Sequence, residues 1–282
     1  MTCDSRFLKL RGVMIKIVEN NGVALLQSNL LLSSHGFSTR VGGVSRTEHT
    51  ASLNLAYGRG DDDATVMENL KIFCSQISVE PEDVISVPQI HSADVKVVGE
   101  KEKGIGVSKS APFSCDGYVT GEKGVPIGIK TADCVPILLE ARDEENNVIA
   151  VSAIHAGWRG TVDGIARVAI EKLVSLGADP EKIYVAIGPC IHSCCYEVGE
   201  DFVKAVKEKL GQNYDENYII SRSSNKKYAD ITKINLDILL QCGVPRGNID
   251  VCELCTCCHT ELFYSHRASR GKRGTMMSVI QK

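Results

Sequence analysis

Two histidines and one cysteine lie beside apolar runs of the sequence, where their side chains could hold a metal ion. His91 follows the run Val84–Val87, Cys134 precedes the run Val135–Leu139, and His155 lies where a further run meets a glycine-rich turn. Two imidazoles and a thiolate form a borderline-soft donor set that suits zinc, and three protein ligands leave a fourth position open for substrate. These residue types therefore predict a catalytic zinc site.

The same three residues are compatible with other chemistry. A cysteine next to a histidine can act as a nucleophile, so Cys134 and His155 also fit a thiol hydrolase. A metal in a non-enzymatic scaffold is a further alternative, although a closed structural site wants four ligands. Taken singly, each residue also fits plain packing or hydrogen bonding. Because the three residues are far apart in sequence, their spacing leaves these alternatives open.

The glycine-rich turn at Gly157–Thr161 indicates a place for phosphate. Backbone N–H groups at the start of a helix attract anions, and Arg159 lies within this turn. Any sharp connection from a strand to a helix also uses glycine, so the turn fits a purely structural role as well.

Further cysteines gather near the carboxyl end in a C-x2-C-x2-C pattern. An iron–sulfur ferredoxin would continue this pattern with a cysteine and a proline, where this chain has Leu262 and Phe263. Reduced thiols are one interpretation, and a second metal site completed by cysteines from elsewhere in the chain is the other. The cysteines concerned are Cys252, Cys255, Cys257 and Cys258, with Cys190, Cys194 and Cys195 as partners in space.

Strands and helices must position these side chains. Apolar runs bounded by turn residues predict strands, and apolar residues three and four positions apart predict helices. The expected strands are Val84–Val87, Val95–Val98, Val125–Ile129, Val135–Glu140, Val148–Ile154, Ile183–Ile187 and Ile249–Cys252. The expected helices are Val162–Leu176, Asp201–Leu210 and Thr232–Cys242. Strands that alternate with amphipathic helices predict a layered α/β domain.

The composition describes an ordinary globular chain. It has 282 residues, 43% of them hydrophobic and 24% charged, without repeats or long linkers, so we expect a single domain over 1–282. A net charge of −3 with scattered basic residues gives no stripe for a nucleic acid. No run is long enough for a membrane span, and Met1–Gly12 lacks the apolar core of a signal peptide. We therefore expect a cytoplasmic protein whose cysteines are reduced.

Longer motifs follow one another along most of the chain. They are HGFSTRVGGVS at His35–Ser45, SLNLAYGRGDD at Ser52–Asp62, PQIHSADV at Pro88–Val95, CDGYVT at Cys115–Thr120, KTADCVPILL at Lys130–Leu139, AIHAGWRGT at Ala153–Thr161, AIGPCIHSCCYEVG at Ala186–Gly199 and LFYSHRASRGKRG at Leu262–Gly274. In this order the motifs resemble the YfiH-like, laccase-domain family of purine nucleoside phosphorylases, from His35 to Ile280.

The resemblance implies a fold and a set of site residues. The fold is a layered α/β sandwich of two mixed sheets flanked by helices, related to the toxin-type cysteine hydrolase fold, with 1–30 as an N-terminal extension and first strands. The metal would be zinc, with copper as an alternative. The implied metal ligands are His91, Cys134 and His155, and the expected substrate contacts are Arg40, Asn54 and Arg267, together with Arg159 of the turn.

The resemblance also implies an activity. Members of the family cleave adenosine, inosine, guanosine or methylthioadenosine with phosphate, and deaminate adenosine. We therefore expect small-molecule partners, a purine nucleoside and phosphate, and a monomer or weak homodimer. The combined H-x-E and P-C-x-x-C signature of other zinc deaminases is absent, because no P-C-x-x-C occurs in the chain, so deamination would be a separate invention.

Two alternatives concern relatives with other names. Bacterial relatives are linked to the editing of peptidoglycan precursors, which would change the substrate class without changing the metal site. An older name of the family is multicopper polyphenol oxidase. The chain holds only seven histidines and no His-X-His pair, whereas a coupled copper cluster needs many histidines besides those of a blue-copper centre.

Overall fold

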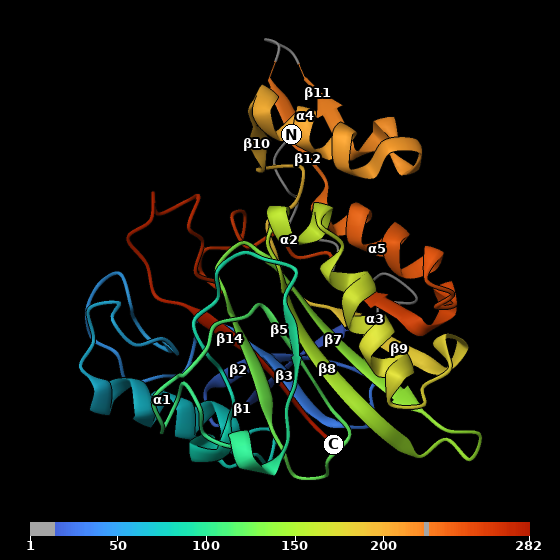
Figure 1. The fold of residues 1–282 in the computed structure, drawn as a ribbon. Helices are drawn as coiled ribbons and strands as arrows, with labels where there is room; N and C mark the ends of the chain where they lie inside the picture. Colours follow the sequence, from blue (N-terminus) through green and yellow to red (C-terminus); the bar gives the residue numbers. More distant parts are fainter. Residues whose placement is uncertain (1–14, 223–225) are drawn as a thin grey trace.

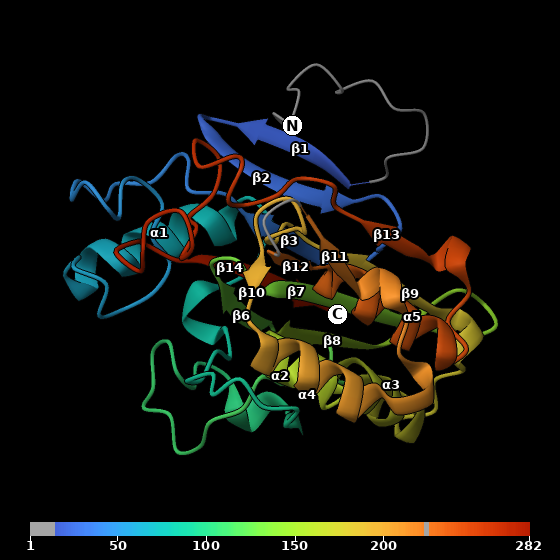
Figure 2. The same ribbon diagram turned by 90° about the horizontal axis from the view of Figure 1, so that it is seen from above.

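The computed structural model describes residues 15–222 and 226–282. Two large sheets lie face to face, as Figures 1 and 2 show from two directions. The first sheet has the order β1-β2-β3-β14-β6 and pairs antiparallel throughout. Its strands are β1 (Ile15–Asn20), β2 (Val23–Ser28), β3 (Ser34–Ser38), β14 (Met276–Gln281) and β6 (Ile127–Thr131). The C-terminal strand β14 therefore lies inside this sheet, between β3 and β6.

The second sheet is mixed and has the order β13-β9-β7-β8-β5-β4. Only its outer pairs, β13 with β9 and β4 with β5, run parallel. Its strands are β13 (Ile249–Val251), β9 (Ile183–Ile187), β7 (Val135–Arg142), β8 (Val148–Ala156), β5 (Gly117–Thr120) and β4 (Val95–Val97). The two long central strands, β7 and β8, form the rigid support from which the site residues extend.

Side chains alternate across β7 and so fill two separate cores. Ile137 and Leu139 pack toward the helices, whereas Leu138 packs between the two sheets with residues such as Phe37 and Ile127. All of β7 is buried because it is covered on both faces. A strand buried on both sides is an uninterrupted apolar run, and such a run is visible in the sequence.

Helices cover the outer face of each sheet. On the five-stranded sheet α1 (Asp63–Ser75) packs against β14, while α3 (Ile165–Ser175) and α5 (Ile231–Gln241) pack on the six-stranded sheet. The remaining helices are α2 (Trp158–Val162) and α4 (Glu200–Leu210). In Figure 2, α3 and α4 lie on the side of β8 that faces away from β1 and β2. The layered α/β sandwich of two sheets is thus confirmed. Only the six-stranded sheet is mixed, however, because every strand pair of the five-stranded sheet is antiparallel.

Several elements differ from the sequence prediction. A third, small sheet has the order β10-β12-β11, formed by β10 (Glu197–Val198), β12 (Lys227–Ala229) and β11 (Ile219–Ser221). The predicted strand Val84–Val87 is wrong, because this buried segment makes only one isolated bridge, between Ile85 and Ile127. The predicted helix Val162–Leu176 is interrupted at Gly164, whose φ of 84° lies in the left-handed region that glycine tolerates.

The segment 1–30, expected to hold an N-terminal extension and the first strands, is described from Ile15 onward. Strands β1 and β2 lie within this segment, while residues 1–14 fall outside the described part of the chain. Among residues 15–222 and 226–282, no helix combines the length and the apolar character needed to cross a bilayer.

Candidate metal centre

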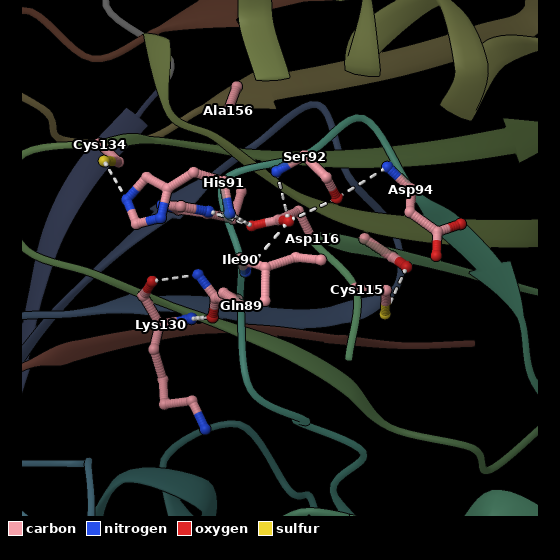
Figure 3. Close-up of polar contacts among 12 residues, drawn as sticks. Gln89, Ile90, His91, Ser92, Asp94, Cys115, Asp116, Lys130, Cys134 and Ala156 are labelled. Atoms are coloured by element: carbon pink, nitrogen blue, oxygen red, sulfur yellow. Dashed lines mark hydrogen bonds and ion pairs between the residues drawn. The ribbon is translucent and has the colours of Figure 1, made fainter. Parts of the chain in front are cut away.

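Antiparallel pairing brings two of the predicted ligands together. Val135 pairs with Ala156 and Pro136 with His155, so the start of β7 lies beside the end of β8. Cys134 directly precedes β7, and its side chain therefore reaches His155. The third residue, His91, lies on the loop before β4, and its ring points toward Cys134 (Figure 3).

The three side chains lie close enough to share one ion. Their donor atoms lie within 4.8 Å of one another, and Cys134 Sγ is 4.0 Å from His91 Nε2. The two imidazole rings meet edge to face, with centroids 4.9 Å apart. A side chain at Gly157 would intrude here, since its Cβ would lie 2.9 Å from His91 Cδ2. Glycine at this position keeps the space between the donors free.

The carboxylate of Asp116 organises both histidines. It accepts hydrogen bonds from the backbone N–H groups of Ile90, His91 and Ser92 at 3.2, 3.0 and 2.7 Å, from Ser92 Oγ at 2.8 Å, and from His155 Nδ1 at 2.8 Å (Figure 3). Such carboxylate–histidine pairs are typical of metal sites, because they fix the ring and its tautomer. With Nδ1 donating to Asp116, Nε2 of His155 is left as the ligand atom.

The charges of the site favour its ionised forms. Burial opposes ionisation of Asp116, but hydrogen bonds from His155 and Ser92 lower its pKa to about 2. Burial likewise opposes the thiolate, yet the charge of His155 and hydrogen bonds from both histidines lower the pKa of Cys134 to about 6. Burial alone would lower the pKa of His155, but Cys134 and Asp116 raise it to about 9. A thiolate is the form that binds metal, whereas a metal ion would have to displace the proton from Nε2 of His155.

Two residues of the site hold backbone conformations that are uncommon outside glycine. The φ of His91 is 60° and that of Asp133, just before Cys134, is 94°. The carboxylate of Asp133 accepts hydrogen bonds from Thr256 Oγ1 at 2.6 Å and from Arg267 N at 2.7 Å, which hold it in place. Left-handed residues of this kind concentrate at functional sites, where surrounding contacts impose them.

The three donors lie in the wall of a cavity of about 980 Å³. Its lining includes four cationic side chains, those of Arg59, Lys109, Lys130 and Arg273. Within the part of the chain that the structure describes, none of the four pairs with a carboxylate. The lining also includes one carboxylate, that of Asp63, so the cavity combines the candidate metal ligands with an excess of cationic side chains.

The cations of this cavity influence one another. Burial and the charge of Arg59 together lower the pKa of Lys130 to about 8, and the same two causes lower the pKa of Arg273. Lys130 Nζ donates to the carbonyl of Ser86 at 3.0 Å, and Arg273 Nη1 donates to Thr275 Oγ1 at 2.8 Å. Arg273 Nε is buried and has no hydrogen-bond partner among the residues that the structure describes. Mutual repulsion and an unused donor both favour a bound anion.

The four expected substrate contacts lie outside the lining of this cavity. Arg40 donates to the carbonyls of Ala51 and Thr260, and Arg267 donates to the carbonyl of Glu197. The guanidinium groups of Arg40 and Arg267 are therefore both engaged in hydrogen bonds to the backbone. A role of Arg40 or Arg267 in substrate binding stays a prediction.

Asn54 and Arg159 also have protein partners. Asn54 is buried and donates to Asp61 Oδ2 at 2.9 Å, which positions the loop that leads to Arg59. The exposed guanidinium of Arg159 stacks on the Trp158 ring at 4.4 Å. The turn around it has a packing role, because a Cβ at Gly160 would lie 2.5 Å from the Ser92 carbonyl oxygen. Contacts of Asn54 or Arg159 with substrate likewise stay predictions.

Sequence reasoning missed the residues that support and line the site. Asp116 lies in the CDGYVT motif, Lys130 begins KTADC, and Arg59 and Arg273 belong to the motifs SLNLAYGRGDD and LFYSHRASRGKRG. The sequence signal that could have identified these residues was their charge, because each lies in a motif that is otherwise apolar or rich in glycine. Only the fold shows that these segments meet at one cavity.

Comparison with known proteins agrees with the motifs. The family described as "Multi-copper polyphenol oxidoreductase laccase" matches residues 34–282. The chain is 36% identical over 261 residues to "Purine nucleoside phosphorylase" of Deinococcus radiodurans, covering 92% of this chain and 93% of that protein. It is 33% identical over 249 residues to "Adenosine deaminase RL5" of an unknown prokaryotic organism, covering 87% and 93%.

The fold agrees as well. The crystal structure of YlmD from Geobacillus stearothermophilus superposes with a TM-score of 0.86 at 32% identity, covering 96% of this chain and 99% of that one. The chain therefore belongs to the multi-copper polyphenol oxidoreductase laccase family, the laccase-domain, YfiH-like family that its motifs resemble.

Proposed function

We propose that this protein is a zinc-dependent purine nucleoside phosphorylase. The observation that carries the proposal is the placement of His91, Cys134 and His155 in the wall of a cavity that also holds unpaired cations. A metal group with a free coordination position and an anion-binding surface are the two features that phosphate-dependent cleavage requires. Relatives named purine nucleoside phosphorylase give the substrate class.

The donor set supports zinc rather than a copper cluster. Two imidazole nitrogens and one thiolate sulfur suit zinc, and tetrahedral geometry places such S and N donors about 3.5 Å apart, near the 4.0 Å between Cys134 and His91. Only His91 and His155 of the seven histidines belong to a metal-binding group in the described residues. When bound, zinc would act as a Lewis acid that polarises a substrate oxygen.

The cationic residues give phosphate its place. Arg59, Lys130 and Arg273 line the same cavity as the metal ligands, so a phosphate held by them lies near a nucleoside bound there. Charge-assisted hydrogen bonds from these side chains would orient the phosphate. Their positive charge would also offset the electrostatic repulsion between the phosphate and the nucleoside. This location replaces the glycine-rich turn at Gly157–Thr161, because α2 is only five residues long and its start is packed.

The reaction is a single exchange of bonds at the ribose. A phosphate oxygen forms a bond to C1′ while the C1′–N9 bond breaks, and the bonding electron pair leaves with the purine. The purine then takes up one proton, which gives free base and ribose-1-phosphate. Tyr57, Met67 and Val107 supply the apolar part of the lining, on which a purine ring can pack.

Adenosine deamination is a second candidate activity. One relative carries the name adenosine deaminase RL5, and a three-ligand metal group suits hydrolysis as well as phosphorolysis. Water would replace the amino group of adenosine and release ammonia, so this reaction needs no phosphate.

Product analysis separates these activities. Purified, zinc-replete protein is incubated with inosine and with adenosine, with and without phosphate, and the products are identified by chromatography. Free base and ribose-1-phosphate that form only with phosphate support phosphorolysis, and inosine formed from adenosine without phosphate supports deamination. Turnover of an ester, an amide or a peptidoglycan precursor, with no base release from any purine nucleoside, would instead favour the thiol hydrolase or editing alternatives.

A further inference from the structure

Four cysteines from two separate loops converge beyond the carboxyl ends of β9 and β13. These strands are parallel neighbours, so the loops that follow them leave the sheet at the same edge. The first loop carries Cys194 and Cys195, and the second carries Cys255 and Cys258 with C-x2-C spacing. An isolated bridge between Cys190 and Cys255 joins the two loops directly.

The distances between the four sulfur atoms suit a single ion. All four lie within 4.8 Å of one another, and Cys258 Sγ is 3.5 Å from Cys194 Sγ and 3.4 Å from Cys195 Sγ. None of the four forms a disulfide. A tetrahedral zinc ion with Zn–S bonds of about 2.3 Å sets its sulfurs about 3.8 Å apart. The group is therefore already close to the size of a zinc tetrathiolate.

Local structure supports this arrangement. The N–H of Cys195 donates to the carbonyl of His192 at 2.9 Å, which closes a turn that directs Cys194 and Cys195 toward Cys258. The N–H of His192 donates to Cys255 Sγ at 3.4 Å. Backbone donors of this kind stabilise a thiolate, which is the form that binds metal.

We propose that Cys194, Cys195, Cys255 and Cys258 bind a second zinc ion in a closed structural site. Four protein ligands complete a tetrahedron and leave no position for substrate, in contrast to the group at His91. The described residues that line the large cavity include none of these cysteines. The mutual sulfur distances fit one ion rather than an iron–sulfur cluster, whose several iron atoms hold their cysteines farther apart.

This site would fix the loops that hold Asp133, next to Cys134. In the first loop, the N–H of Ile191 donates to the carbonyl of Asp133 at 2.9 Å. In the second, Thr256 donates its hydroxyl to the Asp133 carboxylate at 2.6 Å and its N–H to the carbonyl of Cys190 at 2.9 Å. The second zinc would therefore act as a positioning element for the first site and would not contact substrate.

Zinc counting by elemental analysis tests the proposal without any activity assay. Zinc-replete full-length protein should carry about two zinc ions per chain, and the double variant Cys195→Ser with Cys258→Ser should carry about one. Cys257→Ser is the matched control, because Cys257 lies in the same loop but outside the group. This control should keep both ions.

The X-ray absorption spectrum of zinc in His155→Ala separates the two sites. This variant should retain one zinc, with about four sulfur neighbours near 2.3 Å. Unmodified protein that shows all-sulfur zinc but has no phosphorylase activity would contradict the proposed function and support the present proposal. Loss of all zinc from His155→Ala would overturn the present proposal.

Titration of unmodified protein with a mercurial tests the proposal without any substitution, so its result does not depend on whether a variant folds. Blocking the exposed thiol of Cys194 should release zinc to a chromogenic chelator. A disulfide between Cys195 and Cys258 in untreated protein, found by alkylation and mass spectrometry, would overturn the proposal. Iron in place of zinc at these thiolates would also contradict it.

Discussion

Two cysteine-containing groups lie at the same edge of the six-stranded sheet and differ in their ligands. One has two histidines and Cys134 in the wall of a cavity of about 980 Å³, whereas the other has four cysteines and no part in that cavity. Three ligands leave a coordination position for a reactant, and four close the site. The number of candidate ligands, rather than the presence of cysteine, would thus separate the site proposed for chemistry from the site proposed for structure.

The groups also differ in what surrounds them. The three-ligand group of His91, Cys134 and His155 is called the open group, and the four-cysteine group the closed group. Asp116 orients His155 in the open group, and cations without a carboxylate partner, such as Arg59 and Lys130, line the cavity beside it. The closed group is held between two loops by backbone contacts, among them the bridge at Cys190. Changes in the open group should therefore affect turnover, and changes in the closed group should affect stability.

The largest expected effect follows from removing a ligand of the open group. His91→Ala should lower phosphorolysis by about 1000-fold or more, because the lost metal contributes several kcal/mol of transition-state stabilisation. Steady-state kinetics and zinc analysis on the same samples measure both losses. His266→Ala, at an exposed position outside both groups, is the control and should change neither. Near-normal turnover in zinc-free His91→Ala would remove the metal from the mechanism.

A smaller effect is expected from the residue that orients the histidines. Asp116→Asn should weaken zinc binding at the open group by about 10-fold to 100-fold, as is typical when such a supporting carboxylate is lost. Competition with a chelator of known affinity measures this change. Asp94→Asn is the matched control, because Asp94 is in the same region but pairs with Lys96 at the surface. Equal zinc affinity in both variants would refute the role of Asp116.

The next prediction concerns phosphate. Arg59→Ala should raise the KM for phosphate about tenfold, since one charge-assisted hydrogen bond contributes about 1.5 kcal/mol. Arg159→Ala should leave this KM unchanged, because its guanidinium stacks on Trp158 outside the cavity. Initial rates at varied phosphate concentration test both variants. The reverse result would place phosphate at the Gly157–Thr161 turn.

The smallest expected effect is on pH dependence. The pKa of Lys130 is lowered to about 8, so its amine is charged below this pH and becomes neutral above it. Phosphate affinity should therefore fall as pH rises through 8, by about threefold at pH near 9. Lys130→Arg keeps its charge and should lose this part of the pH profile. The same decline in both proteins would exclude Lys130 as its cause.

The sequence predicted the strands of the six-stranded sheet better than those of the five-stranded sheet. The strands β7, β8 and β9 are apolar runs because both faces are buried. In contrast, β3 has the sequence SHGFS and becomes a strand through pairing with β14, more than 200 residues later. Such long-range pairing leaves no local pattern, which explains why β3 and β14 were missed.

The site shows the same division. Residue type identified His91, Cys134 and His155, and antiparallel pairing of β7 with β8 brings two of them together. The cavity wall was not predictable, because Arg59, Lys130 and Arg273 come from segments that meet only in the folded chain. The motifs that contain Arg40 and Arg267 are visible in the sequence. Their guanidinium groups bind backbone carbonyls, and their contacts with substrate stay predictions.

Anomalous diffraction at the zinc absorption edge, from crystals of zinc-replete and catalytically active protein, tests the central claim most directly. We predict a peak about 2.3 Å from Cys134 Sγ and about 2.0 Å from an imidazole nitrogen of each of His91 and His155. Active crystals without a zinc peak at this position would contradict the account.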